Sequence, residues 1–515
     1  MRKECVINID LVDIWREPGR KDLLRTLAWG DAVTVIEETA TFLKVEIEWF
    51  REEADGSLTP IPDVGYIEPS KSSRIKPSGI VRPLQDNVVL KVNFVDVQQG
   101  DGAIIESPDG KVILVDGGDN RMFARYLAGR FRRTSKQAPR EIDCILVTHG
   151  DADHFAALPY ILESETHEEA HKRLFIEPRR YFHNGLIKRP AEAKGKSVAD
   201  EALLGAVQKA GGKTFIVGLE DSLLDIPDSE MNASFREWKA VLKEYDSRSR
   251  SAGKGGIEFR RLQFGDAAAF DFFSGNGLRV EVLGPLVEDA GGRPGLRFLG
   301  EPRAGARLNG DALGTGTEDF TGLSAKHTIN GHSVVIRLVY GGFSYLFAGD
   351  LNDESGRALV REHRKGTLTL RSEVFKVPHH GSADFSGALL EAVAPVVSVV
   401  SSGDESARKD YIHPRATLIG ALGKHSRIPE PLVFVTEMVA FMKIEGRSRL
   451  VDPKKADKRG QFFAFSRAAF GMVKTRTDGK RLLVYTDSAK KGEHEEYAFT
   501  LDAAGEPTPA RVVHA

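Results

Sequence analysis

Four potential metal ligands are crowded into the seven residues that follow an apolar run. The run from Ile142 to Val147 has no helical spacing, so it predicts a buried strand that ends where the polar residues begin. His149 opens the cluster, and Asp151, Asp153 and His154 follow it at two, four and five positions. Imidazole nitrogen with carboxylate oxygen suits zinc, and the carboxylate share leaves manganese or iron open. A solvated surface loop rarely places ligands at four of seven positions, so the pattern predicts a metal site.

These residues also carry a family resemblance. The stretch from His149 to His154 resembles the metal-binding signature of the metallo-β-lactamase superfamily, in the His-x-Asp-x-Asp-His variant of ComEC-type competence proteins. Four other stretches resemble that branch in the expected order: Phe94–Asp101, Ile113–Gly118, Phe347–Asp350 and Val377–Ser382. The resemblance covers roughly residues 88–440. It implies a metallohydrolase with the α/β (α+β) fold of that superfamily, an αββα sandwich.

A dinuclear metal site follows from the resemblance. The implied ligands are His149, Asp151 and His183 for one ion, Asp153, His154 and His380 for the other, and Asp350 as the bridge. Zinc is the first expectation and manganese the alternative, because Asp151 stands where most of the superfamily has a histidine. His183 is chosen because the superfamily places a lone histidine after a strand in this region; a hydrogen-bonded loop histidine is the alternative. Two such ions about 3.5–4 Å apart activate water and clamp the attacked oxygens.

Further residues near these motifs are candidates for catalysis or support. Asp153 and His379 are the candidate catalytic residues, with His379 as the acid for the leaving oxygen. A supporting role for His379 is the alternative, and the sequence leaves open whether His379 or His380 binds the metal. His413 is a weak candidate for a substrate contact, since its His-Pro pair also resembles the branch. Asp116 either orients a metal ligand or only ends a strand.

The composition predicts a cytoplasmic protein of two or three soluble domains. The 515 residues are 41% hydrophobic and 28% charged, with a net charge of −2, which excludes a strongly cationic nucleic-acid binder but allows a local basic groove. Two distant cysteines, Cys5 and Cys144, argue against a disulfide framework and fit a reducing compartment. The N-terminus lacks an apolar signal region, and no apolar run reaches the ~20 residues of a membrane span.

Residues 1–80 differ in style from the remainder. Short strands are predicted at Ala32–Ile36 and Phe42–Ile47, and with the turns between them they resemble a small all-β SH3-like barrel. Its tryptophans are Trp15, Trp29 and Trp49. These aromatic side chains either line a groove for a protein or peptide partner or fill the barrel core. Lys71–Pro83 is the expected linker to the hydrolase domain, residues 84–515.

A helical insertion is predicted at residues 188–260 of the hydrolase domain, where it would cap the active site. Ala199–Ala210 and Phe235–Tyr245 have helical patterns, and Ser247–Gly256 is predicted to be a flexible basic loop. Near the C-terminus, three more strands are expected to complete the second sheet: Phe470–Thr475, Leu482–Tyr485 and Tyr497–Leu501.

Phosphodiesters are the favoured substrates, because the competence branch is associated with nuclease activity. The substrate is then a nucleic acid or a nucleotide. A lactonase or β-lactamase-type ring hydrolase is one alternative, and a metal-stabilised scaffold without catalysis is the other. The stretch His167–His171 matches the His-Glu-x-x-His pattern of zinc proteases, but it lies in a charged segment without an apolar face or a third ligand. We interpret it as a solvated helix.

Overall fold

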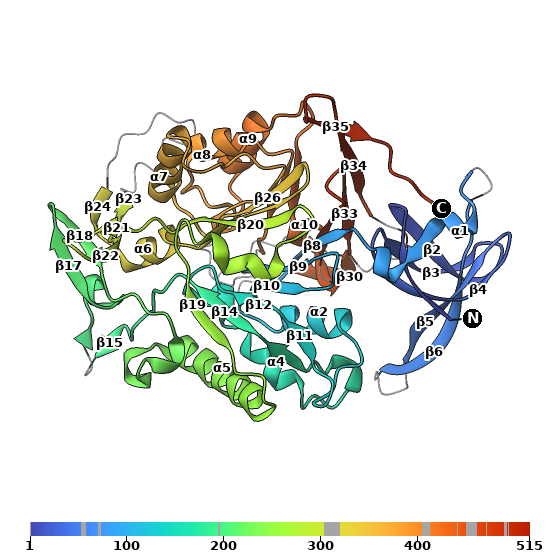
Figure 1. Ribbon diagram of the computed structural model, residues 1–515, viewed down its shortest axis with the longest axis horizontal. Coiled ribbons are helices and arrows are strands. Elements are labelled where there is room, and N and C mark those ends of the chain that lie inside the picture. The colour runs from blue at the N-terminus through green and yellow to red at the C-terminus, as the bar shows by residue number, and fades with distance from the viewer. Residues whose placement is uncertain are drawn as a thin grey trace.

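Two β-sheets pack face to face at the centre of the molecule, and helices cover both outer faces (Figure 1). The computed structural model describes residues 2–52, 58–70, 74–193, 196–302, 320–403, 413–439, 441–449, 461–469, 471–488, 492 and 494–515. This arrangement confirms the predicted αββα sandwich. Among the described residues, no helix combines the length and apolarity needed to cross a bilayer.

The first sheet has ten strands. In spatial order they are β19 (Glu258–Arg261), β14 (Arg180–His183), β12 (Cys144–Leu146), β10 (Val112–Asp116), β9 (Gly102–Glu106), β8 (Leu90–Val95), β32 (Met472–Thr477), β33 (Arg481–Asp487), β34 (Glu496–Leu501) and β35 (Pro507–Ala510). The pairs between β10, β12, β14 and β19 are parallel, so the loops after these strands leave from the same edge.

The prediction that the C-terminal strands complete the second sheet is wrong. β32 pairs antiparallel with β8, from Met472 opposite Val95 to Thr477 opposite Leu90. The strands that follow it then extend the first sheet. The physical reason is that the outer side of β8 presents buried backbone N–H and C=O groups, which need partners.

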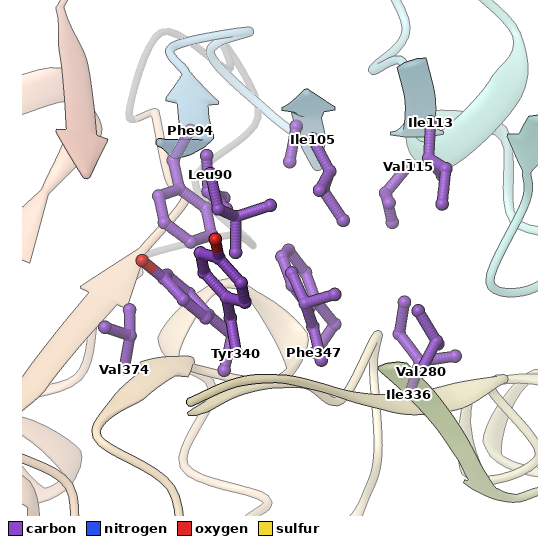
Figure 2. Close-up of a cluster of buried hydrophobic side chains, with 14 of the residues drawn as sticks. Leu90, Phe94, Ile105, Ile113, Val115, Val280, Ile336, Tyr340, Phe347 and Val374 are labelled. Atoms are coloured by element: carbon purple, nitrogen blue, oxygen red, sulfur yellow. The ribbon is translucent and has the colours of Figure 1, made fainter. Parts of the chain in front are cut away.

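The second sheet has six strands. In spatial order they are β20 (Leu278–Gly284), β25 (Val335–Tyr340), β26 (Phe343–Phe347), β27 (Val374–Lys376), β28 (Val397–Val400) and β29 (Leu432–Val435). The pairs from β26 to β29 are parallel. Figure 2 shows the core between the sheets, where Phe94, Ile105 and Val115 face Ile336 and Phe347. Phe94 and Phe347 stack with ring centroids 5.7 Å apart, so this core fixes one sheet against the other.

Helices on the two outer faces complete the sandwich. The first sheet is covered by α2 (Met122–Arg130), α4 (Pro159–Ser164) and α5 (Ala233–Ser251), and the second by α7 (Asp353–Arg364), α8 (Gly387–Val393) and α9 (Ala416–His425) (Figure 1). Shorter helices are α1 (Pro77–Ile80), α3 (Ala152–Phe155), α6 (Ala325–Gly331) and α10 (Thr436–Val439).

The insertion contains less helix than its sequence predicts. Phe235–Tyr245 is helical as predicted, and α5 continues to Ser251 through part of the predicted loop. The predicted helix at Ala199–Ala210 is wrong, because that stretch holds one 3₁₀ turn and then strand β17 (Val207–Ala210). β17 forms a hairpin with β18 (Lys213–Ile216). The two glycines between the strands have positive φ, which favours this tight turn over a continuing helix.

An all-β unit precedes the sandwich and lies at the right of Figure 1. Its seven strands, in spatial order, are β3 (Lys21–Ala28), β2 (Leu11–Glu17), β6 (Leu58–Ile67), β5 (Leu43–Glu52), β4 (Ala32–Glu38), β1 (Lys3–Ile7) and β7 (Val81–Pro83). β7 pairs with β1, so the end of the predicted linker belongs to this sheet; residues 71–73 lie outside the described residues. The SH3-like assignment and its peptide partner stay predictions.

Trp29 shows how this unit meets the sandwich. Its side chain is buried with Leu11 against Val89, which directly precedes β8, and against Leu483 and Tyr485 of β33. Trp29 therefore belongs to the joint between the two units and not to an exposed aromatic groove.

A buried set of charged side chains lies at the same joint. The Glu106 carboxylate accepts hydrogen bonds from Arg130 at 2.9 and 3.0 Å, and the Lys91 ammonium lies 3.6 Å from it. Lys91 also donates to the Gly30 carbonyl at 3.3 Å, and Arg476 lies 3.6 Å from Asp31. Gly30 and Asp31 of the N-terminal unit thus interact with charged side chains of the first sheet, and this set of charges includes residues of β8, β9, β32 and α2. Arg130, the last residue of α2, is the cation that donates both hydrogen bonds to Glu106.

Candidate metal centre

Loops at the ends of strands from both sheets bring imidazoles and carboxylates together in the interior. His149 and His154 follow β12, Asp350 follows β26, and His380 follows β27. All four residues are at most 2% exposed. Three of them, His154, Asp350 and His380, form a group with Asp101, which lies just before β9. Each of these four residues places one ligand atom within 4.8 Å of the ligand atoms of the others. The structure therefore brings together predicted ligands that lie more than two hundred residues apart in the chain.

The Asp350 carboxylate lies at the centre of this group. Its Oδ1 is 3.2 Å from His154 Nε2, and its Oδ2 is 3.3 Å from His380 Nε2 and 3.8 Å from His149 Nε2. Asp153 joins the group through its Oδ2, which is 3.4 Å from His380 Nε2. Three imidazole nitrogens and two carboxylates thus converge on one small volume.

The outer nitrogens of two imidazoles are held by other groups. His154 Nδ1 lies 2.9 Å from Asp116 Oδ2, and His380 Nδ1 donates to the Ser401 carbonyl at 3.1 Å. A proton on Nδ1 leaves the lone pair of Nε2 directed into the cluster, which is the state in which histidine binds a metal.

The inner atoms of the cluster meet the requirements of a cation site. Nε2 of His149, His154 and His380 and Oδ1 of Asp350 are buried; the three nitrogens lie 3.2–3.8 Å from the Asp350 carboxylate, but none of these atoms forms a hydrogen bond with a described residue. Buried polar atoms without partners are costly, and a divalent cation would satisfy all of these at once. Imidazole nitrogen with carboxylate oxygen is a donor set that suits zinc and also manganese. The residues at this position fit the ion that the resemblance implies.

Asp116 orients His154, which decides between the two roles open for it. Its Oδ2 faces His154 Nδ1, and it also accepts hydrogen bonds from the backbone N–H and the hydroxyl of Thr148 at 2.7 Å. Asp116 is fully buried and adopts a positive φ of 57°. This backbone conformation is unfavourable for a non-glycine residue and is maintained by the surrounding contacts.

The shifts in pKa follow from the crowding of opposite charges. Burial alone would lower the pKa of His154 and of His380, but the carboxylate of Asp350 raises both well above the ordinary value. Burial alone would raise the pKa of Asp350 and of Asp153, but the neighbouring imidazoles lower both. The carboxylates therefore stay ionised, as ligands for a cation must be, and a cation bound here would displace the second proton from the imidazoles.

Asp151 is close to the cluster but has protein partners. The Lys188 ammonium donates to its Oδ1 at 2.8 Å. With its nitrogen turned toward Asp151, the Asn330 amide donates to Oδ2 at 3.0 Å. Both carboxylate oxygens are thus engaged by cationic or neutral donors of the protein.

His183, predicted as a ligand of the first ion, has both ring nitrogens engaged by backbone groups. Its Nδ1 accepts the Gly185 N–H at 3.1 Å, and its Nε2 lies 3.2 Å from the Asp221 carbonyl. Its ring stacks on Tyr181 at 5.1 Å, and burial lowers its pKa to about 4. Both nitrogens of a neutral imidazole are thereby satisfied, as in the hydrogen-bonded loop histidine that was the alternative.

His379 and His413 lie at the edge of the cluster. The His379 ring is 6.3 Å from the His380 ring and 6.2 Å from the His413 ring, measured between centroids. His379 Nε2 lies 3.3 Å from the Asn330 side chain. Burial lowers the pKa of His413 to about 4, and the charges of His380 and His379 add to this effect. His380, not His379, is the histidine that faces Asp350.

Sequence reasoning missed Asp101, Lys376, Lys188 and Asn330. Asp101 directly precedes β9; its Oδ1 is 3.2 Å from His380 Nδ1, and its Oδ2 is 2.7 Å from the Lys376 ammonium. A signal for Asp101 was present, because it ends the first stretch that resembles the competence branch. A Cβ at Gly100 would lie 1.9 Å from the Asp153 carbonyl oxygen, so only glycine allows this loop to approach the cluster. Lys188 and Asn330 had no comparable sequence signal.

The protease-like stretch His167–His171 does not have the geometry of a metal site. Ala170–Lys172 forms a 3₁₀ turn, so the predicted helix is wrong, and the two histidines do not share a helical face. His167 Nδ1 accepts the Glu169 N–H, and His171 Nε2 pairs with Glu169 Oε2 at 3.3 Å.

Because local groups occupy these nitrogens of His167 and His171, we expect His171→Ala to leave the metal content unchanged, as measured by mass spectrometry of the bound metal. A loss of metal would contradict this assignment.

Comparisons with known proteins agree with this geometry. Residues 95–226 match the family model of the metallo-beta-lactamase superfamily. Competence protein ComA of Neisseria gonorrhoeae is 37% identical over 97 residues, and ComE operon protein 3 of Bacillus subtilis (strain 168) is 28% identical over 98 residues. Each match covers 19% of this chain, but only 13% and 12% of the respective relative. These findings confirm the resemblance read from the sequence.

Proposed function

We propose that this chain, which carries a metallo-β-lactamase domain related to competence proteins, is a metal-dependent hydrolase that cleaves phosphodiesters. The observation that carries the proposal is the convergence of three buried imidazole Nε2 atoms on the Asp350 carboxylate. Without a bound cation, these buried polar atoms would lower the stability of the fold, because burying a polar atom without a hydrogen bond costs free energy.

The substrate class rests on the resemblance and on the chemistry of the site. A divalent ion bound there supplies Lewis-acid activation of water and of the attacked oxygen. Negative charge develops on the non-bridging oxygens of a phosphodiester, and a cationic centre favours that charge distribution. The competence branch is associated with nuclease activity, which favours a nucleic acid or a nucleotide over a lactone.

The chain's own groups supply orientation and proton transfer. Asp116 holds His154, and the Ser401 carbonyl holds His380, so that both imidazoles keep Nε2 toward the cluster. His379 lies beside His380 and is the group proposed to protonate the leaving oxygen. Its Nδ1 is buried and has no hydrogen-bond partner among the described residues, so it is available to carry or accept a proton.

Metal removal provides the direct test. We expect dialysis against a chelator to lower hydrolysis of bis-p-nitrophenyl phosphate by at least ~100-fold, because the ion activates the attacking water. Zinc is the first ion to add back and manganese the second. Restoration by one of them, together with metal measured in the purified protein, would support the proposal.

Two other outcomes would contradict it. Bound metal without phosphodiesterase activity, but with hydrolysis of a lactone or a β-lactam, would favour the ring hydrolase. Bound metal without hydrolysis of any of these substrates would favour the metal-stabilised scaffold without catalysis.

A further inference from the structure

Two ligands predicted for the first metal ion differ from the histidines predicted for the second in whether protein groups already engage their ligand atoms. Of the residues expected to hold the first ion, His183 has both ring nitrogens engaged by backbone groups. Asp151 has both carboxylate oxygens engaged by Lys188 and Asn330. Freeing these atoms for a cation would break hydrogen bonds of buried groups, which costs free energy. The donor set present at this position does not fit a metal ion.

Lys188 occupies the place where that ion would contribute positive charge. Its ammonium lies 2.8 Å from Asp151 Oδ1, while its side chain remains 31% exposed. The backbone of Lys188 is anchored as well, because its carbonyl accepts the N–H of Asn232, the residue that caps α5. The ammonium is therefore held beside the cluster and can still contact a molecule that arrives from solvent.

The inner nitrogens of His154 and His380, predicted to hold the second ion, differ in this respect from the ligand atoms of Asp151 and His183. Nε2 of His154 and His380 and Oδ1 of Asp350 are buried and form no hydrogen bond with the part of the chain that the structure describes, and Nε2 of His149 is in the same state. His149 Nε2 is directed at Asp350, 3.8 Å from its Oδ2, so it belongs to the same convergent group. Protein cations engage Asp151 and Asp101, but neither lysine reaches these inner atoms.

We propose that the cluster binds one divalent ion per chain and that Lys188 acts in place of the first ion of the dinuclear pattern. The ion would be held by His149, His154, His380, Asp153 and Asp350. The Lys188 ammonium would contact a non-bridging oxygen of the phosphodiester, so that one fixed charge and one ion bind the anion together. This inference rests on the proposed function and adds to it the number of ions and a substrate-positioning residue.

The number of bound ions tests the first half of the inference. Apo-protein is loaded with zinc or with manganese, dialysed, and analysed for metal per chain by mass spectrometry. We expect one ion per chain, both in the wild type and in Lys188→Ala. Two ions in the wild type would overturn the inference but leave the proposed hydrolase intact. No ion would overturn the proposed hydrolase as well.

Binding of inorganic phosphate tests the role of Lys188 without relying on turnover. In calorimetric titrations of the metal-loaded protein, we expect Lys188→Ala to bind phosphate about tenfold more weakly, the typical effect of losing one charged hydrogen bond. Lys188→Arg should stay within about threefold of the wild type, since it retains the charge. Lys213→Ala is the matched control, because Lys213 lies on the same insertion but forms an exposed ion pair with Glu288 at 3.1 Å.

Two results would overturn the role of Lys188. One is phosphate affinity in Lys188→Ala equal to that of the wild type, with one ion still bound. The other is an equal loss of affinity in the Lys213→Ala control. The bound ion serves as the folding check, because the ligand cluster forms only in the folded chain.

Discussion

Asp350→Ala is expected to abolish metal binding and to lower kcat for bis-p-nitrophenyl phosphate by at least ~1,000-fold, which corresponds to about 4 kcal/mol of transition-state stabilisation. Asp350 is the carboxylate toward which three buried imidazole nitrogens converge, at 3.2, 3.3 and 3.8 Å. Without it, the remaining donors lose the negative charge at the centre of the group. Metal content and initial rates of hydrolysis are the two measurements.

Asp353→Ala provides a matched control for this variant. Asp353 lies three residues further on, in the first turn of α7, where its carboxylate pairs with Arg357 at 2.8 Å. We expect it to retain metal and activity, with a stability change of about 0.5 kcal/mol or less. If Asp350→Ala still bound metal at the wild-type level, Asp350 would not be a ligand.

Glu106→Gln is expected to lower the free energy of unfolding by about 3–5 kcal/mol, because it removes one partner from a buried ion pair and leaves the other charges uncompensated. The Glu106 side chain is 9% exposed and accepts two hydrogen bonds from Arg130. Lys91, only 10% exposed, would lose its nearest anion. Urea denaturation followed by fluorescence measures the change.

Glu163→Gln is the control for Glu106→Gln. Glu163 pairs with Arg121 at 2.7 Å, but both side chains are more than half exposed, so we expect a change below about 1 kcal/mol. Equal effects of the two substitutions would contradict the importance of the joint between the N-terminal unit and the sandwich.

The stability of the wild type should also depend on pH through Glu106. Burial alone would raise its pKa, but Arg130 and Lys91 lower it to about 2 from the ordinary value of 4.5. A carboxyl group whose pKa is depressed in the folded state contributes its full stability above the ordinary pKa, and this contribution is lost as the pH falls through the folded-state pKa. We therefore expect stability to fall between pH 4.5 and 2, with a shallower decline in Glu106→Gln.

The strands of the sandwich were largely predictable from the sequence. The apolar run Ile142–Val147 and the short strands predicted at Ala32–Ile36 and Phe42–Ile47 coincide with strands that the structure contains. The failures occurred where local pattern competes with pairing. Val207–Ala210 has a helical pattern, but the double glycine after it closes a hairpin. The strands from Met472 onward are local features, yet only the free edge of β8 decides which sheet they join.

By itself, the sequence determined the part of the metal centre that is contiguous along the chain. The spacing from His149 to His154 places its ligands in one loop after one strand, because covalent geometry limits how far they can separate. The resemblance then supplied Asp350 and His380, which the structure brings to the same point.

Only the tertiary structure decided which of the remaining candidates reach that point. His183 lies at the end of β14, but backbone groups of Gly185 and Asp221 engage both of its ring nitrogens. Neither Asp101 nor Lys188 lies at a spacing from the other ligands that would predict a role in the site. Sheet packing brings Asp101 to His380, and the start of the insertion brings Lys188 to Asp151. Contacts between such distant segments depend on strand register and loop path, and local sequence patterns do not encode either one by itself.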